Sequence, residues 1–473
     1  MNASKTIFRS LLLAACALLL ASCNTLVDRL SPEGGEPEAP TKFRRSAPAE
    51  SPTKTTNDAW WKSYRDPVLN DLMDRVEANN PDVRSALARV DQAYAALGIT
   101  GSERFPQLGG STSFTQFKDS ANNLRFPLDQ LKYDQYRVAV NASWELDLWG
   151  RIRGSFRRDQ FKAEATRAQY DDVLLSLRAA LARQYFALRY ARIEKAILVD
   201  GVTVREEALR LQETRVAEGA GVEFDASRAR TELESTRVQA AELDRTTGKL
   251  EHAIAVLAGE APADFKPSKG NTGIRIPDIP AGVPSELLNR RPDLRVAERN
   301  LRAAAEQIGI RKVEFLPRIT LTGSGGVASL RTDNLFASPE SVFRSIGPQV
   351  DVPLFQGGAR KAAESQAEGA WHEAIENYRS VLLTAVQEVD DSLLDLQVLQ
   401  RQIVAQDRAV ASANETARLS KERFNEGFVS YFEVVDAERS RLEAQRIENR
   451  LRGERAATSV QLIQALGGSV GAN

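Results

Sequence analysis

The residue types that most often do chemistry in proteins are scarce in this sequence. Its only cysteines are Cys16 and Cys23, and its only histidines are His252 and His372. A soft-metal or thiol site therefore has almost nothing to be built from. The two histidines, in charged helical surroundings, are interpreted as solvated surface residues rather than ligands or catalytic bases. We expect no enzyme active site, no metal site and no bound cofactor.

Cys23 is the one cysteine whose surroundings suggest a chemical role. Lys5 and Arg9 precede an apolar run, residues 11–21, that is too short to span a bilayer but suits a signal-peptide core. The run ends in Leu20-Ala21-Ser22-Cys23, which resembles the bacterial lipoprotein box. That resemblance implies removal of residues 1–22 and attachment of a diacylglycerol and an N-acyl chain to Cys23. Asn24 is not the aspartate that retains lipoproteins in the inner membrane of enteric bacteria, so an outer-membrane destination is favoured. The alternative is an ordinary signal peptide with an incidental cysteine.

Four charged residues form the other candidate site. Glu433 and Asp436 lie three residues apart, shortly after Gly427, and so share one face of a helix. Several copies of this pair around one opening would favour cations and would repel one another until paired or hydrated. Asp225 and Arg228 occupy the equivalent positions in the first half of the chain, where a salt bridge between neighbouring helix tips that helps to hold a gate shut is one interpretation. The alternative is that all four are solvated charges on a coiled-coil face.

The elements that position these residues occur twice, because the chain repeats itself with a period near 210 residues. Pro81-Asp82 recurs as Pro292-Asp293 at an offset of 211 residues, and Glu218-Gly219 recurs as Glu426-Gly427 at an offset of 208. A fixed offset over many positions indicates a tandem duplication. Each half is predicted to contain a helix, two strands, a very long helix, a tight turn and another helix.

The long helices follow from the distribution of proline. There is none between Pro127 and Pro262 and none after Pro353, so nothing interrupts helices predicted at 151–217, 222–258, 359–426 and 430–466. The first would be roughly 100 Å long at 1.5 Å per residue. Apolar residues in the third follow a heptad rhythm with charges between them, which indicates a coiled coil in water. Gly219 and Gly427 permit the chain reversals at 218–222 and 426–430.

Two strands are predicted in each half, at about 107–118, 135–148, 316–327 and 342–354. From Tyr136 to Leu148 apolar residues alternate with polar or small ones, which favours one face toward lipid and the other toward a polar lumen. Four strands cannot close a barrel without leaving unpaired backbone groups in hydrocarbon. Two copies would give 8 strands and a filled interior, whereas three would give 12 and leave a lumen. A cyclic trimer is therefore the smallest open channel.

The predicted organisation is a signal peptide (1–22), a lipidated N-terminus and Pro-rich linker (23–56), a first repeat (57–260), an inter-repeat linker (261–288), a second repeat (289–467) and a short tail (468–473). The linker from 23 to 56 is too polar and Pro-rich to fold alone. The fold class is an α+β membrane protein. Its expected form is a trimeric 12-stranded β-barrel, continued by a long α-helical coiled-coil barrel and built from a tandem repeat.

Several short motifs in this frame resemble the outer membrane factors, the TolC-like channels, and within them the NodT-type efflux lipoproteins. The resemblance covers essentially the whole mature chain. It rests on the order of the motifs Trp60-Trp61, Asp66-Pro67-Val68-Leu69, Asn80-Pro81-Asp82, Asn289-Arg290-Arg291-Pro292-Asp293-Leu294, Phe315-Leu316-Pro317, Leu354-Phe355-Gln356-Gly357-Gly358 and Gly427-Phe428-Val429-Ser430-Tyr431.

This resemblance implies a homotrimer in the outer membrane with a large periplasmic extension. It implies that the chain forms the exit duct of a tripartite efflux pump, with a periplasmic adaptor and an inner-membrane transporter of the RND type as partners. Glu433 and Asp436 match the acidic residues that narrow the periplasmic entrance of such channels. The turns at Gly219 and Gly427 would contact the adaptor.

Composition and motifs leave a few other functions open. Lys and Arg total 63 and Asp and Glu 64, so no excess of positive charge points to nucleic acid as a partner. The alternatives are a type I secretion duct and a lipid-anchored periplasmic coiled-coil scaffold or stalk. The scaffold accounts for the long helices but not for the alternating strands. A periplasmic lipoprotein enzyme would need a catalytic cluster that the sequence lacks.

Overall fold

The computed structural model describes residues 26–37, 39–40, 43–44, 59–118, 132–266, 274–277, 279 and 290–468. The predicted signal peptide, Cys23 and most of the loop between the first two strands lie outside these residues. The chain divides into two compact units. Unit 1 contains Met1–Pro37, Arg89–Thr166 and Val296–Arg379, and unit 2 contains Glu38–Ala88, Arg167–Arg295 and Ser380–Asn473. Each unit takes segments from both sequence repeats, so the repeats interleave rather than form separate bodies.

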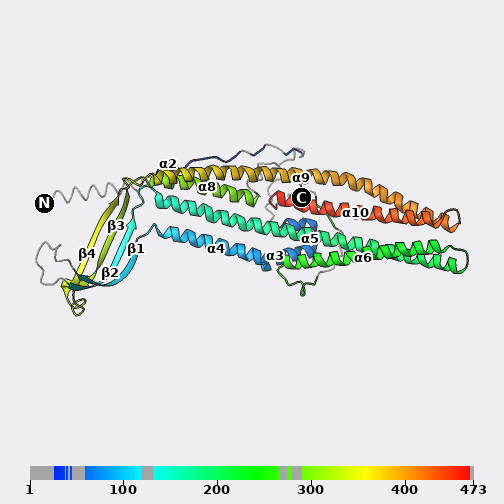
Figure 1. Ribbon diagram of the computed structural model, residues 1–473. Helices are drawn as coiled ribbons and strands as arrows, with labels where there is room; N and C mark the ends of the chain where they lie inside the picture. The colour runs from blue at the N-terminus through cyan, green and yellow to red at the C-terminus, as the bar shows by residue number, and fades with distance from the viewer. Residues whose placement is uncertain are drawn as a thin grey trace. The chain divides into compact units, whose positions relative to one another are not determined.

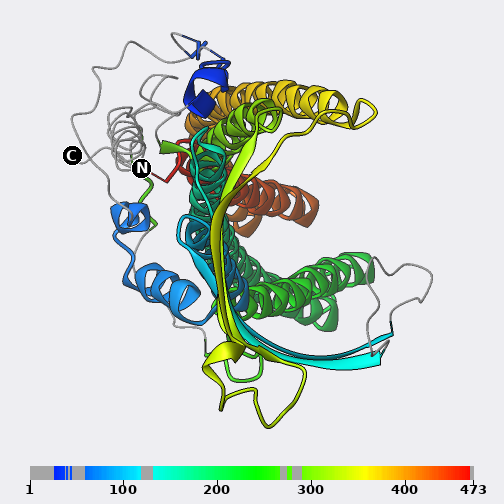
Figure 2. The same cartoon turned by 90° about the vertical axis from the view of Figure 1, so that its left-hand side faces the viewer.

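Unit 1 carries one antiparallel sheet of four strands in the order β1-β2-β3-β4 (Figure 1). Its strands are β1 (Gln107–Lys118), β2 (Lys132–Glu145), β3 (Arg318–Ser329) and β4 (Val342–Asp351). Figure 2 shows that the strands are bowed along their length. Each repeat supplies one adjacent pair, and β2 and β3 join the two pairs in register from Tyr136–Ser329 to Glu145–Thr320.

The strand ends differ from the expected ones for identifiable reasons. β2 begins at Lys132, opposite Lys118, because the ladder with β1 continues to the end of β1. It ends at Glu145, although the apolar alternation runs to Leu148. Beyond Glu145 the chain turns, and the Asp147 carboxylate accepts hydrogen bonds from the backbone N–H groups of Ile152 and Arg153 at 3.0 Å. Capping of the next helix therefore ends the strand. β4 ends at Asp351, two residues before Pro353, which has no N–H group to donate.

Two pairs of long helices have matching lengths in the two repeats. α5 (Arg151–Ala217) and α9 (Ala359–Asn425) are both 67 residues long, and α6 (Glu223–Leu257) and α10 (Tyr431–Ala465) are both 35. α4 (Pro81–Ser102) and α8 (Pro292–Val313) are both 22 and begin at proline, which suits the first helical position because its missing N–H would be unpaired there. The equal lengths are what a tandem duplication predicts. Shorter elements are α2 (Leu26–Leu30), η1 (Trp60–Tyr64), α3 (Pro67–Asn79) and η3 (Pro339–Ser341).

Charged residues are spread along the long helices. Among the described helices, none has both the length and the apolar composition needed to cross a membrane.

The core of unit 2 explains the first of the sequence motifs. Trp60, Trp61 and Tyr64 are at most 3% exposed and pack with apolar residues of α3, α5 and α10. Asp66 caps α3 by accepting the backbone N–H of Val68 at 3.0 Å. The same buried carboxylate accepts hydrogen bonds from the Tyr185 hydroxyl at 2.7 Å and Arg189 at 2.9 Å. One aspartate thus joins the start of α3 to α5, and burial raises the pKa of Tyr185 to about 12.

A second motif ties the end of each repeat to its own beginning. In the first repeat the Asn80 side chain donates to the carbonyl oxygen of Leu257, the last residue of α6, at 2.9 Å. In the second repeat Arg291 donates to the carbonyl oxygen of Ala465, the last residue of α10, at 2.9 Å. Asn80 and Arg291 are equivalent residues, each directly before the proline that begins α4 or α8. We call these two contacts the repeat clasps.

The glycines after α6 and α10 allow the repeat clasps to close. Gly259 and Gly467 have φ angles of 77° and 76°, the left-handed region in which a side chain is strained. A Cβ atom on Gly259 would lie 2.5 Å from the carbonyl oxygen of Asn79, and one on Gly467 would lie 2.7 Å from that of Arg290. The chain therefore needs glycine here for both backbone angle and space. Arg291 also pairs with Glu388 of α9 at 2.7 Å and with Asp293 at 2.7 Å.

The first prediction concerns Arg291, which is 7% exposed. Arg291→Met should lower the free energy of unfolding by about 1–3 kcal/mol, because it leaves the buried carbonyl oxygen of Ala465 without its donor. The carboxylates of Glu388 and Asp293 are partly exposed, so water can replace Arg291 there. Thermal unfolding of the purified protein, followed by far-ultraviolet circular dichroism, measures the change. The control is Arg450→Met, since the Arg450 side chain is 66% exposed on α10. Equal melting temperatures for the two variants would show that the clasp is not stabilising.

Candidate functional site

The pairing register places apolar residues of all four strands on one face of the sheet. Phe114 of β1 lies opposite Tyr136 of β2, with ring centroids 5.0 Å apart. Large apolar side chains on this face are widely exposed, including Ile346 at 81% and Leu108 at 75%. The face is formed by Leu108, Thr112, Phe114, Tyr136, Val138, Val140, Ala142, Trp144, Ile319, Leu321, Val327, Val342, Ile346 and Val350. The charged residues on this face, Lys118, Lys132, Asp134 and Arg344, lie toward the ends where β1 connects to β2 and β3 to β4. The rest of the face is an exposed apolar surface that suits contact with lipid.

The opposite face of the sheet is polar and internally hydrogen-bonded. Asn141 donates to the Ser111 hydroxyl at 3.0 Å, and the hydroxyls of Ser324 and Ser345 lie 2.9 Å apart. Arg137 extends over the ring of Phe343, with its guanidinium carbon 4.2 Å from the ring centroid. Ser324 and Ser345 are paired directly in the register, and Asn141 is a diagonal neighbour of Ser111. Arg137 of β2 reaches Phe343 of β4 across the intervening strand β3. A polar face opposite an apolar one is the pattern of a wall between lipid and water.

The sheet has two open edges. Within the described residues, β1 pairs only with β2 and β4 only with β3. The outer backbone groups of β1 and β4 need partners if the sheet lies in hydrocarbon, since each unpaired group there costs several kcal/mol. The sheet is therefore a segment of a wall that further strands must complete.

The two turns between paired long helices are built in the same way. In the first, Gly219 has a φ angle of 74° and donates to the carbonyl oxygen of Val216 at 3.0 Å, while Ala220 donates to that of Arg215 at 2.9 Å. In the second, Gly427 has a φ angle of 81° and donates to Phe424 at 3.1 Å. Both are Schellman motifs, in which glycine supplies the left-handed residue after the helix. We call these turns, residues 218–222 and 426–430, the hairpin tips.

One requirement of the first tip was not predicted from the sequence. A Cβ atom on Gly221 would lie 2.9 Å from the backbone nitrogen of Val216, so only glycine fits. The second repeat has Val429 at the equivalent position, and the two tips therefore differ despite their common turn. A second glycine two residues after Gly219 was the signal that pointed to this.

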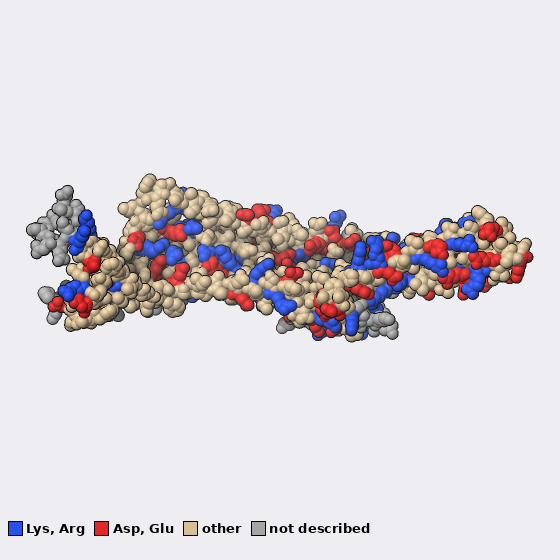
Figure 3. Space-filling view, turned by 60° about the horizontal axis from the view of Figure 1, so that its bottom comes forward, with Lys and Arg blue, Asp and Glu red and all other residues tan. Residues whose placement is uncertain are grey.

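Ion pairs cross between α5 and α6 behind the first tip. Glu206 pairs with Arg237 at 2.6 Å and Glu213 with Arg230 at 2.8 Å. Figure 3 shows acidic and basic side chains interspersed over this end of the helices. Exposed pairs of this kind contribute only about 0.2–1 kcal/mol each. These ion pairs therefore help to specify that α5 packs against α6, and they add little to the stability of the tips.

The four charged residues predicted at the tips have different surroundings. Glu433 is exposed in the first turn of α10, and Asp436 pairs with Arg439 of the same helix at 2.7 Å. Asp225 and Arg228 lie half-buried on α6. Arg228 extends over the ring of Phe432, with its guanidinium carbon 4.2 Å from the centroid. An aromatic ring of the second repeat, beside Glu433, is thus the partner of Arg228 within the chain.

A small apolar cluster joins the two hairpins next to the tips. Phe424 and Tyr431 lie 5.8 Å apart between ring centroids and pack with Ala229 of α6 and Val435 of α10. Arg215 of α5 extends over the Phe424 ring at 4.5 Å. The sequence motif that ends in Tyr431 pointed to a turn but not to this packing. The cluster and the Arg228–Phe432 contact hold the tips of the two repeats together.

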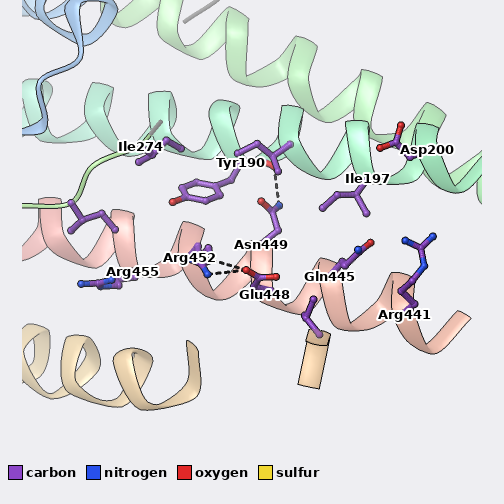
Figure 4. Close-up of a pocket in the computed structure, with 13 residues that line it drawn as sticks. Tyr190, Ile197, Asp200, Ile274, Arg441, Gln445, Glu448, Asn449, Arg452 and Arg455 are labelled. Atoms are coloured by element: carbon purple, nitrogen blue, oxygen red, sulfur yellow. Dashed lines mark hydrogen bonds and ion pairs between the residues drawn. The ribbon is translucent and has the colours of Figure 1, made fainter. Parts of the chain in front are cut away.

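Two other features bear on the chemistry of unit 2. A pocket of about 540 Å³ lies between α5, α9, α10 and residues 274–276, and Figure 4 shows Arg441, Arg452 and Arg455 along its α10 side. Arg452 pairs with Glu448 at 2.8 Å and with Asp407 at 2.9 Å, so the pocket carries mixed charge. In the described part of the chain, no group of three or more His, Cys, Asp or Glu residues could hold a metal ion.

Comparisons with known proteins agree with this arrangement. The family model described as "Outer membrane efflux protein" matches residues 72–260 and 283–468. The solvent efflux pump outer membrane protein SrpC of Pseudomonas putida is 32% identical over 412 residues, which cover 86% of each chain. The probable outer membrane lipoprotein SilC of Salmonella typhimurium is 28% identical and covers 97% of this chain and 98% of its own.

A solved structure shows the same fold. The Campylobacter jejuni CmeC outer membrane channel superposes with a TM-score of 0.86 at 27% sequence identity, and the match covers 93% of this chain and 95% of CmeC. The chain belongs to the outer membrane efflux protein family. The predicted fold class and the predicted function, an outer-membrane channel subunit forming the exit duct of an efflux pump, are confirmed.

Proposed function

We propose that three copies of this chain close one 12-stranded barrel in the outer membrane and that their long helices continue it as a periplasmic tunnel. The observation that carries this proposal is the four-stranded sheet with an apolar face, a polar face and two open edges. Joining β1 of one copy to β4 of the next pairs the open edges. Three copies are the fewest that leave a lumen, because eight strands enclose only side chains.

The hairpin tips form the entrance of the tunnel in this proposal. Glu433 is exposed and has no charged partner within the described residues, while Asp436 has only a surface pair with Arg439. Three copies would place six carboxylates around one opening. Such a ring attracts cations and resists further narrowing unless the carboxylates are paired or hydrated. Asp225 and Arg228 stand at the equivalent positions of the first repeat and complete the ring.

The partners follow from family membership and from the tips. We propose that the tips at Gly219 and Gly427 contact a periplasmic adaptor, which links the duct to an inner-membrane transporter of the RND type. Names of relatives such as the solvent efflux pump protein SrpC support a pump rather than a type I secretion system. The lumen is a passive conduit, and the choice of substrate lies with the transporter.

The second prediction tests the entrance. Replacing both Glu433 and Asp436 with Ala should reduce the cation preference of the channel, because the carboxylate ring is removed. Reversal potentials in planar bilayers under a salt gradient measure this preference. The matched control replaces Glu443 and Glu454 with Ala, which removes the same charge from exposed positions further along α10. A tip variant that keeps the cation preference of the control would identify Glu433 and Asp436 as ordinary solvated charges.

We also propose that Cys23 carries the lipid anchor. The first described residues after it are fixed to unit 1, which carries the sheet. Val27 is fully buried against Ile310 and Val313, and its N–H group donates to the Trp149 carbonyl oxygen at 3.3 Å. An acyl chain on Cys23, four residues earlier, would therefore attach close to the unit that bears the lipid-facing strands. The lipoprotein name of SilC supports this assignment.

The third prediction follows from this assignment. Cys23→Ala should abolish acylation and leave the leader uncleaved or cleaved without lipid, because the thiol is the attachment point. Intact-protein mass spectrometry gives the result directly. The barrel should still insert, since one anchor contributes only part of the membrane affinity. Detection of an acylated N-terminus in the variant would disprove the assignment.

A further inference from the structure

A cavity lies between the two helical hairpins, close to the hairpin tips. Its volume is about 190 Å³, and we call it the tip cavity. α5 forms one side, and the end of α9 and the start of α10 form the other. Glu232 of α6 completes the wall.

Much of the wall of the tip cavity is apolar. Leu211 and Ala208 face it from α5, and Phe424, Val434 and Val435 face it from the second hairpin. Cavities of about 150 Å³ with walls of this type bind benzene. The tip cavity is slightly larger, so it has room for one ring with one small substituent.

Two deeply buried polar side chains also face the tip cavity. Arg205 is 9% exposed, and among the described residues its only hydrogen bond runs from Nη1 to the Gly201 carbonyl oxygen at 3.2 Å. Tyr431 is 7% exposed, and no residue in the described part of the chain hydrogen-bonds its hydroxyl. Buried donors without acceptors are unfavourable. Neither Arg205 nor Tyr431 is among the fully enclosed polar groups without a partner, so both donors are open to the tip cavity, where water or a bound molecule supplies the acceptor.

The charges around Arg205 decide what kind of acceptor fits. Glu232 and Glu438 act on its guanidinium electrostatically, and burial outweighs them and lowers the pKa of Arg205. Glu438 is itself paired with Arg441 at 2.8 Å. These carboxylates, with Glu207 at the rim, would repel an anion. A neutral molecule with one acceptor oxygen meets the need for a hydrogen bond without that repulsion.

We propose that the tip cavity is a binding site for a small neutral organic molecule, a single ring or short branched chain with one carbonyl oxygen. The oxygen accepts hydrogen bonds from Arg205 and Tyr431, and the hydrocarbon part contacts Phe424, Leu211 and Val435. Glu433 and Asp436 do not line the tip cavity, so this site is separate from the proposed entrance ring.

Binding in the tip cavity has a consequence for the channel. The bound molecule contacts α5 of the first hairpin and α9 and α10 of the second, so it stabilises the packing of the two hairpins. A ligand shifts an equilibrium only toward the state that it binds better. The molecule should therefore favour the packed state of the tips and lower the resting conductance. This second part rests on the proposed function, whereas binding itself does not.

The fourth prediction tests binding with 4-fluoroacetophenone as the probe. The full-length acylated protein in lipid nanodiscs is titrated and followed by ¹⁹F NMR, with empty nanodiscs subtracted. We expect saturable binding that Arg205→Met weakens about tenfold, because one charge-assisted hydrogen bond is lost. Ala208→Leu should weaken it about as much by filling the tip cavity. Arg210→Met is the matched control, since Arg210 is an exposed residue of α5 that does not line the cavity.

Further arms of the experiment separate the alternatives. Val204→Phe fills the tip cavity from another position, and circular dichroism identifies any variant that has not folded. The anion 4-fluorobenzoate should bind at least about tenfold more weakly than the ketone. If the probe does not bind saturably to the unmodified protein, the site is disproved. It is also disproved if Ala208→Leu and Val204→Phe both bind the probe as tightly as the unmodified protein does. Tighter binding of the anion would overturn the proposed ligand class.

Bilayer recordings with the same probe test the coupling. A fall in resting conductance that Ala208→Leu abolishes supports it, and unchanged conductance at saturating probe refutes it. If no preparation forms channels, the proposed function is wrong. The NMR titration still shows whether the tip cavity binds the probe.

Discussion

The unpaired backbone of β1 and β4 is the constraint on which the rest of this structure depends. A sheet with one apolar face belongs in lipid, yet a sheet in lipid cannot leave its edges open, because no water is present to bond the free N–H and C=O groups. The chain offers four strands, ordered β1-β2-β3-β4, and no more within its described residues. Assembly is therefore part of the fold. The polar face, with its Asn141–Ser111 and Ser324–Ser345 contacts, becomes the lining only once copies complete the wall.

The tandem duplication extends the same logic to the helices. Each repeat supplies two strands and one hairpin of 67- and 35-residue helices. The repeat clasps at Asn80 and Arg291 end each hairpin on the start of its own repeat, and Gly259 and Gly467 give the chain room to do so. The two repeats have equivalent contacts at the repeat clasps and differ at the hairpin tips. At the tips, Arg228 of the first repeat lies against the ring of Phe432 in the same chain. Asp436, the residue equivalent to Arg228 in the second repeat, forms only an exposed ion pair with Arg439. The equivalent pairs therefore differ in charge: Asp225 and Arg228 are neutral together, whereas Glu433 and Asp436 are both negative.

Local signals predicted most of the architecture. Long proline-free segments and glycines at the turns were enough to place α5 at its observed bounds and to find both hairpin tips, because these features depend on residues close in sequence. The alternation along β2 predicted its two faces but extended it too far, since Leu146 and Leu148 continue the pattern while Asp147 caps α5. The sequence could not predict the Arg228–Phe432 contact or the repeat clasps, because each joins residues that are far apart along the chain. It could not predict the burial of Arg205, because that burial depends on how the helices pack. The roles of Glu433 and Asp436 stay predictions, since they depend on how several copies meet.

The number of chains in the assembled duct tests the central claim most directly. Native mass spectrometry of the complex released from outer membranes into detergent gives that number without assumptions about shape. We predict three copies, because that is the smallest number whose strands enclose a lumen while pairing all the edges. A stable single chain, or a closed pair of chains, would contradict the account. Either result would mean that the edges of β1 and β4 are satisfied in some other way.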